Sequence, residues 1–459
     1  MSRPRIVIVG AGFAGYQAAR TLSRKLRGTA EIVLVNPNDY FLYLPLLPEV
    51  SSGELEPRRV SVSLAGTLPG VRLVLGVVHG VDLAGRRVRY TDPEGREDEL
   101  DYDKLLLSVG SVNKLLPVPG VAEYARGFRG MPEALYLRDH LTRQIAMAAT
   151  ARDPAERAAR CTFVVVGAGY TGTEVAAHGT LFTDSLAAQH SRPTGGPPVE
   201  LRPRWMLLDV APRVLPGLDE RLAAAADRVL RGRNVEVRTN TSVREATADG
   251  VWLDDGSFVP TRSLIWCVGV RPDPLVEDLG LPTDHGRLVV DPYLTVPGHP
   301  EVLACGDAAA VPDLTRPGRY TPMTAQHASR QGRLAGRNLA AALGIGVRTR
   351  YKHHDLGFTV DLGGTQAAAD PFGVLLSGLP ANVVTRCYHL AAMPGNRIRV
   401  AADWLLDTVL PRQAVQLGMV RSGDVPLDTA SPGLAGSPPA GSGPDGRAGG
   451  GGGGASRAA

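Results

Sequence analysis

The sequence predicts an α/β fold with two Rossmann-like domains and a C-terminal segment of different character. Three observations lead to this prediction: a strand, a glycine turn and a helix follow one another at the N-terminus, the same pattern returns near residue 165, and the composition changes beyond residue 350. The 459 residues are also too many for one ordinary hydrophobic core, so two or three domains are expected.

The first pattern begins with RIVIV at residues 5–9, a β-branched run typical of a buried parallel strand. GAGFAG at 10–15 follows it and leads into the helical stretch YQAARTLSRKL. In such a turn the first glycine allows a tight bend, the second lets a pyrophosphate approach the backbone, and the third lets the helix pack on the strand. The pattern therefore predicts a dinucleotide-binding domain. Its candidate contacts are Gly10, Gly12, Phe13, Ala14 and Gly15.

Asn36 ends the next expected strand, EIVLV at 31–35, at a place where an acidic residue normally binds a ribose hydroxyl. An amide can form a hydrogen bond with the same hydroxyl, but without the help of a negative charge. We therefore keep Asn36 as a candidate contact that departs from the usual pattern.

The same pattern returns with the strand CTFVVV at 161–166, the turn GAGYTG at 167–172 and the helix start TEVAA. Two such turns in one chain are much more specific than one. The acidic candidate, Asp209, comes later than usual because a Pro/Gly-rich insertion around 191–198 lengthens the connection. The candidate contacts of this second dinucleotide-binding domain are Gly167, Gly169, Tyr170, Thr171, Gly172 and Asp209.

A third feature is EVLACGDA at 301–308, a strand that runs into Gly306 and Asp307. An enzyme that binds two dinucleotides can hold a flavin tightly and reduce it with a nicotinamide that comes and goes. The Gly-Asp pair resembles the element with which two-dinucleotide flavoproteins hold the ribityl and phosphate part of FAD. A plain turn or cap residue is the alternative interpretation of Asp307.

With these residues the chain resembles the pyridine-nucleotide-dependent flavoprotein reductases, and within them the type II NADH dehydrogenases, which are single-subunit NADH:quinone oxidoreductases. The resemblance covers roughly residues 4–420. Three segments point to the quinone-reducing branch: FLYLPLLPEVSSGEL at 41–55, TAQHASRQG at 324–332 and HLAAMPGNRIRVAADWLLD at 389–407.

The resemblance implies a glutathione-reductase-like plan. The FAD-binding domain comes in two parts, 1–120 and 285–345, around an NAD(H)-binding domain at 121–284. A strand and amphipathic helix region at 346–420 faces a membrane. The Gly/Pro-rich tail at 421–459 is expected to be disordered, because its composition cannot offset the entropy of ordering it.

By the same resemblance, hydride passes from NADH to FAD, and two electrons and two protons then pass to a membrane quinone without proton pumping. The alternative is a soluble FAD-dependent NAD(P)H reductase that passes electrons to a ferredoxin-like protein. A sulfide:quinone reductase would need cysteines beside the flavin. The four cysteines, at 161, 267, 305 and 387, form no CxxC pair, and core packing is the default for the first three.

The resemblance also implies further contacts. Those to FAD are Ser108, Gly110 and Ala325. Those to NADH are Val268 and Gly269. A carboxylate at Asp209 would repel the 2′-phosphate of NADPH and so favours NADH, although Arg213 nearby could admit NADPH.

The helix that starts at TAQHASRQG has no large apolar residue in its first turn, so a core does not anchor this helix end. In a flavoprotein of this plan its N-terminus faces the flavin, where free N–H groups and the helix dipole stabilise negative charge. Gln326 is placed beside the ring, and Gln331, about 140° further around the helix, is the weaker candidate. Glu174 is implied to help deliver protons to the quinone, and a simple helix-start charge is the alternative. The candidate catalytic residues are thus Glu174, Gln326 and Gln331.

The charge and hydropathy patterns indicate which partners the chain can have. A net charge of +4 argues against a nucleic-acid partner. No apolar run of about 18 residues occurs, so any membrane contact is peripheral. Between 397 and 410, apolar residues recur at helical spacing beside arginines, so this helix can lie in a membrane interface with Trp404 at headgroup depth. A homodimer interface or the protein's own core fits the stripe equally, but the quinone resemblance favours the cytoplasmic face of the cell membrane.

Overall fold

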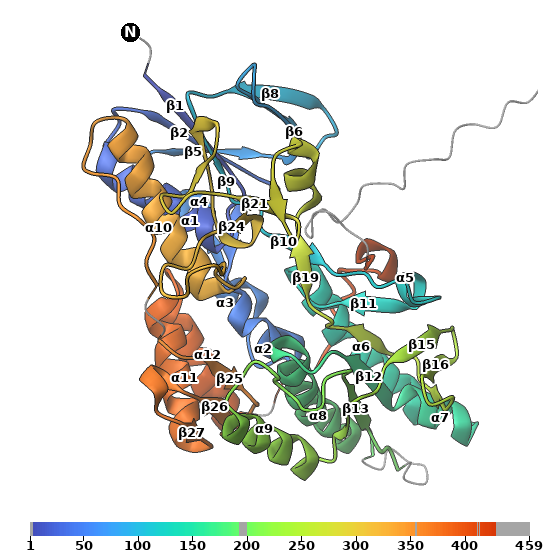
Figure 1. Ribbon diagram of the computed structural model, residues 1–459. Helices are drawn as coiled ribbons and strands as arrows, with labels where there is room; N and C mark the ends of the chain where they lie inside the picture. Colours follow the sequence, from blue (N-terminus) through green and yellow to red (C-terminus); the bar gives the residue numbers. More distant parts are fainter. Residues whose placement is uncertain (1–2, 192–199, 354–355, 411, 413, 428–459) are drawn as a thin grey trace, which may run out of the picture.

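The computed structural model describes residues 3–191, 200–353, 356–410, 412 and 414–427. Figure 1 shows a first α/β domain around the blue strands, a second around the green elements, and the orange-red C-terminal helices beside both. Most of the predicted insertion around 191–198, and the tail from residue 428, lie outside the described residues. Both predicted patterns of strand, glycine turn and helix are confirmed.

The first domain contains a six-stranded sheet in the order β22-β23-β9-β1-β2-β5. Its strands are β1 (Arg5–Val9), β2 (Glu31–Asn36), β5 (Val71–Leu75), β9 (Lys104–Leu107), β22 (Thr295–Val296) and β23 (His299–Ala304). All neighbouring pairs are parallel except β22 with β23. Since β22 and β23 follow the whole second domain in the sequence, the first domain is built from two separate pieces of chain.

Helices α1 (Phe13–Leu26) and α10 (Ala325–Ala342) pack closely against each other (Figure 1). Glycines of α10 make this possible, because a Cβ atom on Gly332 would lie 2.0 Å from the carbonyl oxygen of Ala14. Gly336 faces Ala18 in the same way. The two helices therefore run in the same direction, and both N-termini point toward the carboxyl ends of the strands.

The second domain contains a five-stranded parallel sheet in the order β11-β18-β12-β13-β14. Its strands are β11 (Ala125–Gly127), β12 (Thr162–Val166), β13 (Arg204–Leu208), β14 (Glu236–Arg238) and β18 (Leu264–Trp266). The helices of this domain are α5 (Val121–Tyr124), α6 (Met131–Thr150), α7 (Pro154–Arg160), α8 (Tyr170–His190) and α9 (Glu220–Gly232). Helix α8 lies close to β13 because Gly179 leaves room for the indole of Trp205.

Shorter elements complete both domains. In the first they are β3 (Tyr40–Leu42), η1 (Leu44–Leu46), α2 (Leu47–Ser51), α3 (Pro57–Val60), β4 (Ser61–Ser63), α4 (Leu64–Thr67), β6 (Val77–Asp82), β7 (Arg87–Thr91) and β8 (Glu97–Asp101). In the second they are β15 (Val243–Ala246), β16 (Gly250–Leu253) and β17 (Phe258–Pro260). Between them β10 (Ser111–Asn113) pairs with β19 (Val270–Pro272). Beyond β19 follow η2 (Pro274–Leu279), β20 (Thr283–Asp284), β21 (Arg287–Val289), η3 (Gly306–Ala308) and β24 (Ala309–Ala310).

The C-terminal region forms a small sheet and two helices. Its elements are β25 (Thr359–Asp361), β26 (Ala367–Ala369), β27 (Leu376–Ser377), α11 (Leu379–Ala392) and α12 (Arg397–Val409). The sequence DLGFTVDLGG at 355–364 predicts a strand pair with turn residues, and this prediction is wrong. The described part of this stretch holds β25 alone, because its antiparallel partner β26 begins beyond the turn at Gly363 and Gly364.

Helix α12 has two unlike faces. The predicted apolar stripe is on the outside, where Ile398 is 86%, Leu405 66% and Val409 73% exposed. On the inside, Val400 and Trp404 are buried, and the indole N–H of Trp404 donates a hydrogen bond to Glu49. The expectation that Trp404 lies at headgroup depth is therefore wrong, since its indole packs toward α2.

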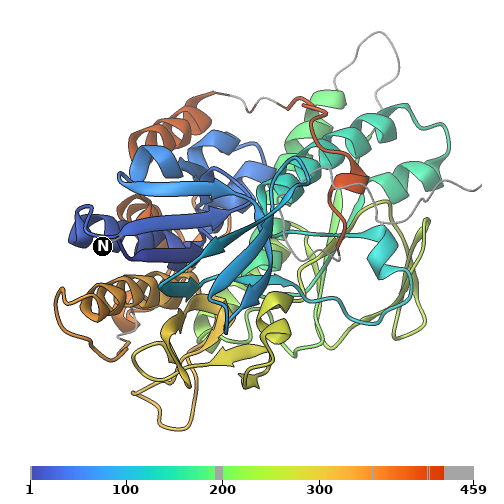
Figure 2. The ribbon, with the colours of Figure 1, turned by 90° about the horizontal axis from the view of Figure 1, so that it is seen from above.

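Residues 414–427 run back to the second domain (Figure 2, red beside green). The backbone N–H groups of Leu417 and Gly418 donate to the carboxylate of Asp139 at 3.0 and 2.7 Å, and Leu427 is buried. The tail predicted to be disordered begins at residue 421, but residues 421–427 include η5 (Ser422–Asp424) and the buried side chains of Val425 and Leu427. Each helix of the described residues is too short or too polar to span a bilayer.

Candidate functional site

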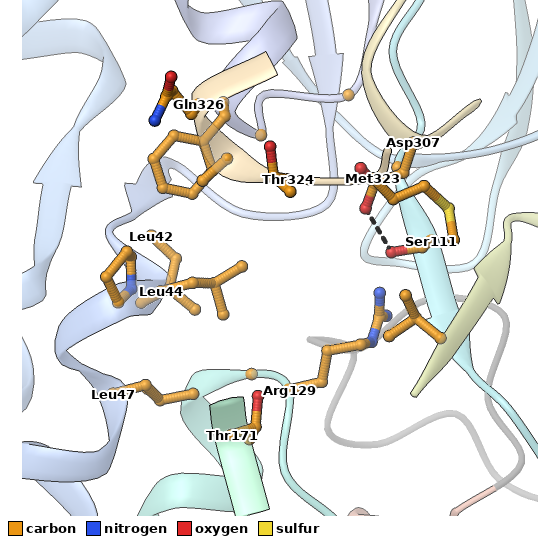
Figure 3. Close-up of a pocket in the computed structure, with 18 of the residues that line it drawn as sticks. Leu42, Leu44, Leu47, Ser111, Arg129, Thr171, Asp307, Met323, Thr324 and Gln326 are labelled. Atoms are coloured by element: carbon orange, nitrogen blue, oxygen red, sulfur yellow. Dashed lines mark hydrogen bonds between the residues drawn. The ribbon is translucent and has the colours of Figure 1, made fainter. Parts of the chain in front are cut away.

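One large cavity, of about 800 Å³, lies between the two domains and the C-terminal region. Its wall includes the first glycine turn, the LPLLP segment at 44–48, residues 108–111 and 128–132, the N-termini of α8 and α10, and parts of residues 356–389. Figure 3 shows their side chains pointing into it. A polar end and an apolar end can be distinguished in this cavity.

The first glycine turn forms part of the polar end. A Cβ atom on Gly10 would lie 2.5 Å from the carbonyl oxygen of Ser108, and one on Gly15 would lie 1.8 Å from that of Gly10. A Cβ atom on Gly12 would meet open space. The first and third glycines thus allow close backbone packing, whereas the second leaves the free volume that a pyrophosphate requires. Phe13 and Gly110 also line the cavity, and Ala14 lies behind it.

Asn36 lines the cavity but has a structural role as well. Its Oδ1 accepts a hydrogen bond from the backbone N–H of Ala11 at 2.8 Å, and its Nδ2 donates to the carbonyl of Asn38 at 2.8 Å. Asp209 occupies the corresponding place in the second domain and accepts from the N–H groups of Ala168 and Ala211. The amide therefore preserves the contact between strand end and glycine turn that the carboxylate makes in the second domain.

Asp307 and Arg129 both line the cavity. Asp307 accepts a hydrogen bond from the hydroxyl of Ser111 at 2.8 Å, and burial raises the pKa of its carboxyl (Figure 3). Arg129 is largely buried, and its Nε and one terminal nitrogen have no hydrogen-bond partner among the described residues. An unpaired buried guanidinium at a cavity wall fits an anionic group. The sequence analysis missed Arg129 and Ser111, although an arginine inside the apolar stretch FRGMP was a usable signal.

The N-terminus of α10 enters the cavity as predicted, with Thr324, Ala325 and Gln326 in its wall. The hydroxyl of Thr324 caps the helix by accepting from the N–H of His327 at 3.2 Å. The amide of Gln326 bonds the backbone of Leu356 and Gly357 at 3.3 Å each, so it also fixes the facing loop.

Gln331 is not a cavity residue, so the prediction of a catalytic role for it is wrong. It is 1% exposed, and its Oε1 accepts from the N–H of Gly306 at 2.8 Å while its Nε2 donates to the hydroxyl of Thr321 at 3.0 Å. The side chain points from α10 into the protein interior. Gln331 thus positions the turn that carries Asp307.

Helix α8 brings the second glycine turn to the same cavity. Tyr170, Thr171 and Glu174 line it. The Oε1 atom of Glu174 accepts from the N–H of Asp361 at 3.1 Å. Burial, with a contribution from the charge of Asp361, raises the pKa of Glu174 to about 8, so this carboxyl holds a proton at neutral pH.

The remaining predicted contacts to NADH lie outside the wall of this cavity. They are Gly167, Gly169, Gly172, Asp209, Val268 and Gly269. A Cβ atom on Gly167 would lie 2.3 Å from the carbonyl oxygen of Cys267, and one on Gly172 would lie 1.9 Å from that of Gly167. Gly169, like Gly12 in the first turn, faces open space. The second turn therefore has the same cradle geometry as the first.

The apolar end of the cavity opens beside the C-terminal region. Leu44 and Leu47 line it from the LPLLP segment, and Phe372 and Val384 line it from the other side. Phe372 is 79% exposed, which places it on the rim as well as in the wall. None of the four cysteines lines the cavity, and burial raises the pKa of Cys267 and Cys305 to about 12, so neither thiol is ionised at neutral pH.

Comparisons with known proteins agree with this geometry. The family model described as pyridine nucleotide-disulphide oxidoreductase matches residues 4–332. The type II NADH:quinone oxidoreductase NdhA of Mycobacterium tuberculosis is 33% identical over 323 residues, which cover 68% of this chain and 67% of that protein. The type II NADH:quinone oxidoreductase Ndh of the same organism is 29% identical over 415 residues, which cover 87% and 86%.

Among solved structures, NDH2 from Plasmodium falciparum in complex with NADH matches this chain with a TM-score of 0.80. The match covers 90% of this chain and 100% of that chain at 16% sequence identity. At this identity the likeness shows a shared fold, and this fold includes the C-terminal region beyond residue 332.

Proposed function

Because the chain belongs to the type II NADH:quinone oxidoreductases of the pyridine nucleotide-disulphide oxidoreductase family, we propose that it oxidises NADH and reduces a quinone without pumping protons. Bound FAD supplies the redox chemistry, since a flavin can accept a hydride and give up two electrons. The observation that carries the proposal is one cavity that extends from the first glycine turn, past Tyr170 and Thr171 of the second, to the apolar side chains of Phe372 and Leu44.

The polar end of the cavity fits FAD. The free volume at Gly12 and the guanidinium of Arg129 suit the pyrophosphate, and Asp307 with Ser111 suits the hydroxyl-bearing chain next to it. The N-terminus of α10, at Ala325, would place N–H groups and the positive end of the helix dipole where the flavin ring becomes negatively charged.

The second turn would hold NADH, since the open space at Gly169 suits a pyrophosphate and the carboxylate of Asp209 suits a ribose hydroxyl. Thr171 and Glu174 extend α8 from that turn into the cavity. A nicotinamide held there would face the flavin across the N-terminus of α8. This arrangement supports direct hydride transfer and keeps the apolar opening free for the second substrate.

Glu174 is proposed to give a proton to the quinone as it is reduced. It lines the cavity, and its raised pKa keeps it protonated at neutral pH. Glu174→Gln keeps the shape and removes the proton, so quinone turnover should fall and lose its pH dependence while reduction by NADH persists. Unchanged turnover with an unchanged pH profile would contradict this role.

The apolar outer face of α12 is proposed to lie in a membrane surface. It is adjacent in sequence to α11, whose Val384 lines the cavity. Arg397 and Arg399 stand at the start of α12, where they can meet lipid phosphates. This orientation would bring the apolar opening to the bilayer that holds a quinone, at its cytoplasmic face.

The test of the proposed function is anaerobic NADH oxidation by the FAD-loaded protein with a short-chain menaquinone analogue. Many turnovers per flavin are expected, and Gln326→Ala should slow them because Gln326 fixes both the helix start and the facing loop. Flavin reduction without onward transfer to the quinone would contradict the proposal. A ferredoxin-like acceptor would then be the next substrate class to assay.

A further inference from the structure

A cluster of ionisable side chains lies directly behind the cavity, where three distant parts of the chain meet. Glu49 and Glu54 come from α2 and the turn after it, His178 from α8, and Asp361 from the end of β25. These four residues are between 1% and 6% exposed. Glu174, one helical turn before His178, connects the cluster to the cavity.

His178 lies between two carboxylates. Its Nδ1 is 3.5 Å from Oε2 of Glu54, and its Nε2 is 3.5 Å from Oδ1 of Asp361. A carboxylate on each side favours a hydrogen on each ring nitrogen, which is the imidazolium form. Burial by itself would lower the pKa of His178, but the carboxylates of Asp361 and Glu54 on either side outweigh burial and raise the pKa to about 10.

The other side of the cluster leads toward the surface. Oε1 of Glu54 accepts from Arg386 at 3.0 Å, and Oε2 accepts from Arg412 at 3.1 Å. The side chains of these arginines are 23% and 15% exposed, whereas that of Glu54 is 2% exposed. The cluster therefore spans the distance from the cavity wall to partly exposed cations of the C-terminal region.

A purely structural purpose does not explain these residue types. Taking an imidazolium and two carboxylates out of water carries a large hydration cost, and apolar side chains of similar volume often join chain segments equally well. If His178 only held chain segments together, a ring that can release and regain a proton would offer no advantage. The choice of His178 between Glu54 and Asp361 thus points to proton movement.

The proposed reaction requires a proton from water in each turnover. Reduction of a quinone to a quinol consumes two electrons and two protons, whereas NADH brings two electrons and one proton as hydride. Glu174 can supply the missing proton repeatedly only if its carboxylate is protonated again between turnovers.

We propose that His178 and Asp361 form the route by which Glu174 regains its proton, an inference that rests on the proposed function. The Nε2–H bond of His178 breaks and the proton passes to the carboxylate of Asp361. The O–H bond formed there breaks as the proton passes to the carboxylate of Glu174, whose Oε1 already accepts from the backbone N–H of Asp361 at 3.1 Å. A hydronium ion from solvent then protonates the carboxylate of Glu54, and the O–H bond formed there breaks as its proton passes to Nδ1 of His178. No electrons move in these steps. Both relay residues act through Glu174 and do not touch the substrate.

Other charged or titratable groups also face the cluster: Glu49, Arg233, Arg386, His389 and Arg412. Burial, then the charges of Glu54 and Asp361, raise the pKa of Glu49 well above its ordinary value, so it keeps its proton. Burial lowers the pKa of His389 to about 4, so it stays neutral. Glu49 and His389 are therefore both uncharged near neutral pH.

The test compares His178→Gln, which loses both charge and proton exchange, with His178→Lys, which keeps the charge but releases its proton poorly. Stopped-flow traces of the FAD-loaded protein, reduced by NADH and mixed with excess quinone, separate the first turnover from later ones. Because the first turnover uses the proton already on Glu174, both variants should complete it at the wild-type rate. Later turnovers should be at least tenfold slower.

The matched control is His140→Gln, since His140 is also buried and lies outside the cavity wall. It should leave all turnovers within twofold of wild type. Wild-type steady-state rates in His178→Lys, or an equal loss in the first turnover, would overturn the relay. If the wild-type protein reduces no quinone, the proposed function fails instead, and this outcome is visible before any variant is made.

A second readout uses the wild-type protein alone and does not depend on catalytic turnover. In the wild-type protein with histidine ¹⁵N labels, the ring of His178 should show two N–H groups from pH 6 to 9, and an infrared band of the protonated Glu174 carboxyl should disappear with a midpoint near pH 8. A ring of His178 that is neutral across this range would overturn the proposal.

Discussion

Arg129 carries two unpaired guanidinium nitrogens into the polar end of the cavity. Hydrogen bonds to a charged group are worth about 1.5–3 kcal/mol, which corresponds to roughly a 10- to 100-fold change in affinity. Arg129→Ala is therefore expected to weaken FAD binding by that factor. The amount of flavin that stays with the protein on dilution and gel filtration, read from visible absorbance, measures it.

Arg152, on the surface between α6 and α7, provides the control for this change. Arg152→Ala removes the same charge from the chain and should leave flavin retention unchanged. Equal retention in Arg129→Ala and the wild-type protein would show that Arg129 does not contact the cofactor.

The raised pKa of Glu174 makes stability depend on pH. Its pKa is about 8 in the folded protein against an ordinary value of 4.5, so the folded state binds the proton more tightly. Its contribution is fully present below about pH 4.5 and is lost as the pH rises through about 8. Glu174→Gln cannot ionise, so its melting temperature relative to wild type should increase steadily from pH 5 to pH 9.

Thermal melts of both proteins across this range measure the difference. Glu200→Gln, which changes an exposed carboxylate, should show no such trend. A constant difference between Glu174→Gln and wild type would mean that Glu174 is ionised in the folded protein at neutral pH.

At this scale the sequence predicted residues with a local signature and missed those defined by distant contacts. Gly12 and Gly169 were placed correctly because each follows a strand and starts a helix. Gln331 was misassigned because its partners, Gly306 and Thr321, lie elsewhere in the chain. His178 carried no signal, since its function depends on carboxylates from two other segments.

At the level of elements, the glycine turns are what join strands to helices. A methyl group on Gly172 would lie 1.9 Å from the carbonyl oxygen of Gly167, so α8 cannot keep its approach to β12 in Gly172→Ala. We expect NADH binding to weaken at least tenfold, because the glycine turn at 167–172 would lose the shape that leaves room for a pyrophosphate at Gly169. FAD binding should persist, since the first turn is separate.

Flavin content and the NADH concentration that gives half-maximal flavin reduction measure the two effects. Gly217→Ala is the control, because a Cβ atom there would meet nothing within 4 Å. Loss of flavin together with NADH affinity in Gly172→Ala would indicate general unfolding and contradict the assignment of separate sites.

Elements with a clear hydrophobic period were predictable, and pairings across a turn were not. The spacing of Ile398, Leu405 and Val409 predicted α12, whereas it left open whether the apolar stripe meets a membrane, a second copy of the chain or the protein's own core. The stretch around β25 also has strand character, but only the fold shows that its partner is β26. The inner face of α12 escaped prediction because Trp404 is amphipathic and suits either a membrane interface or a buried hydrogen bond.

At the level of the whole molecule, the exposed face of α12 is the surface that we propose to bind a membrane. Burial of an apolar side chain contributes roughly 1.5–3 kcal/mol. Replacing Ile398, Leu405 and Val409 together by glutamine should therefore reduce binding to phospholipid vesicles at least tenfold, as measured by flotation. Substitution is a sharper test than deletion of residues 379–459, which would also remove the buried Trp404.

The control replaces three exposed apolar residues from other surfaces, Met147, Val210 and Val347, by glutamine. This variant should float with vesicles as the wild-type protein does. If the α12 variant still binds vesicles but changes from dimer to monomer in sedimentation, the face joins two copies of the chain and the membrane proposal is wrong.

The divided first domain has a consequence for synthesis of the chain. The six-stranded sheet lacks β22 and β23 until residue 304 has been made, and α10 follows later still. The five strands of the second sheet, by contrast, are complete at Trp266. The second domain can therefore fold as it leaves the ribosome, before β22 and β23 have been made to complete the first sheet. FAD can therefore bind only late in synthesis, after β23 has paired with β9 and α10 has packed against α1.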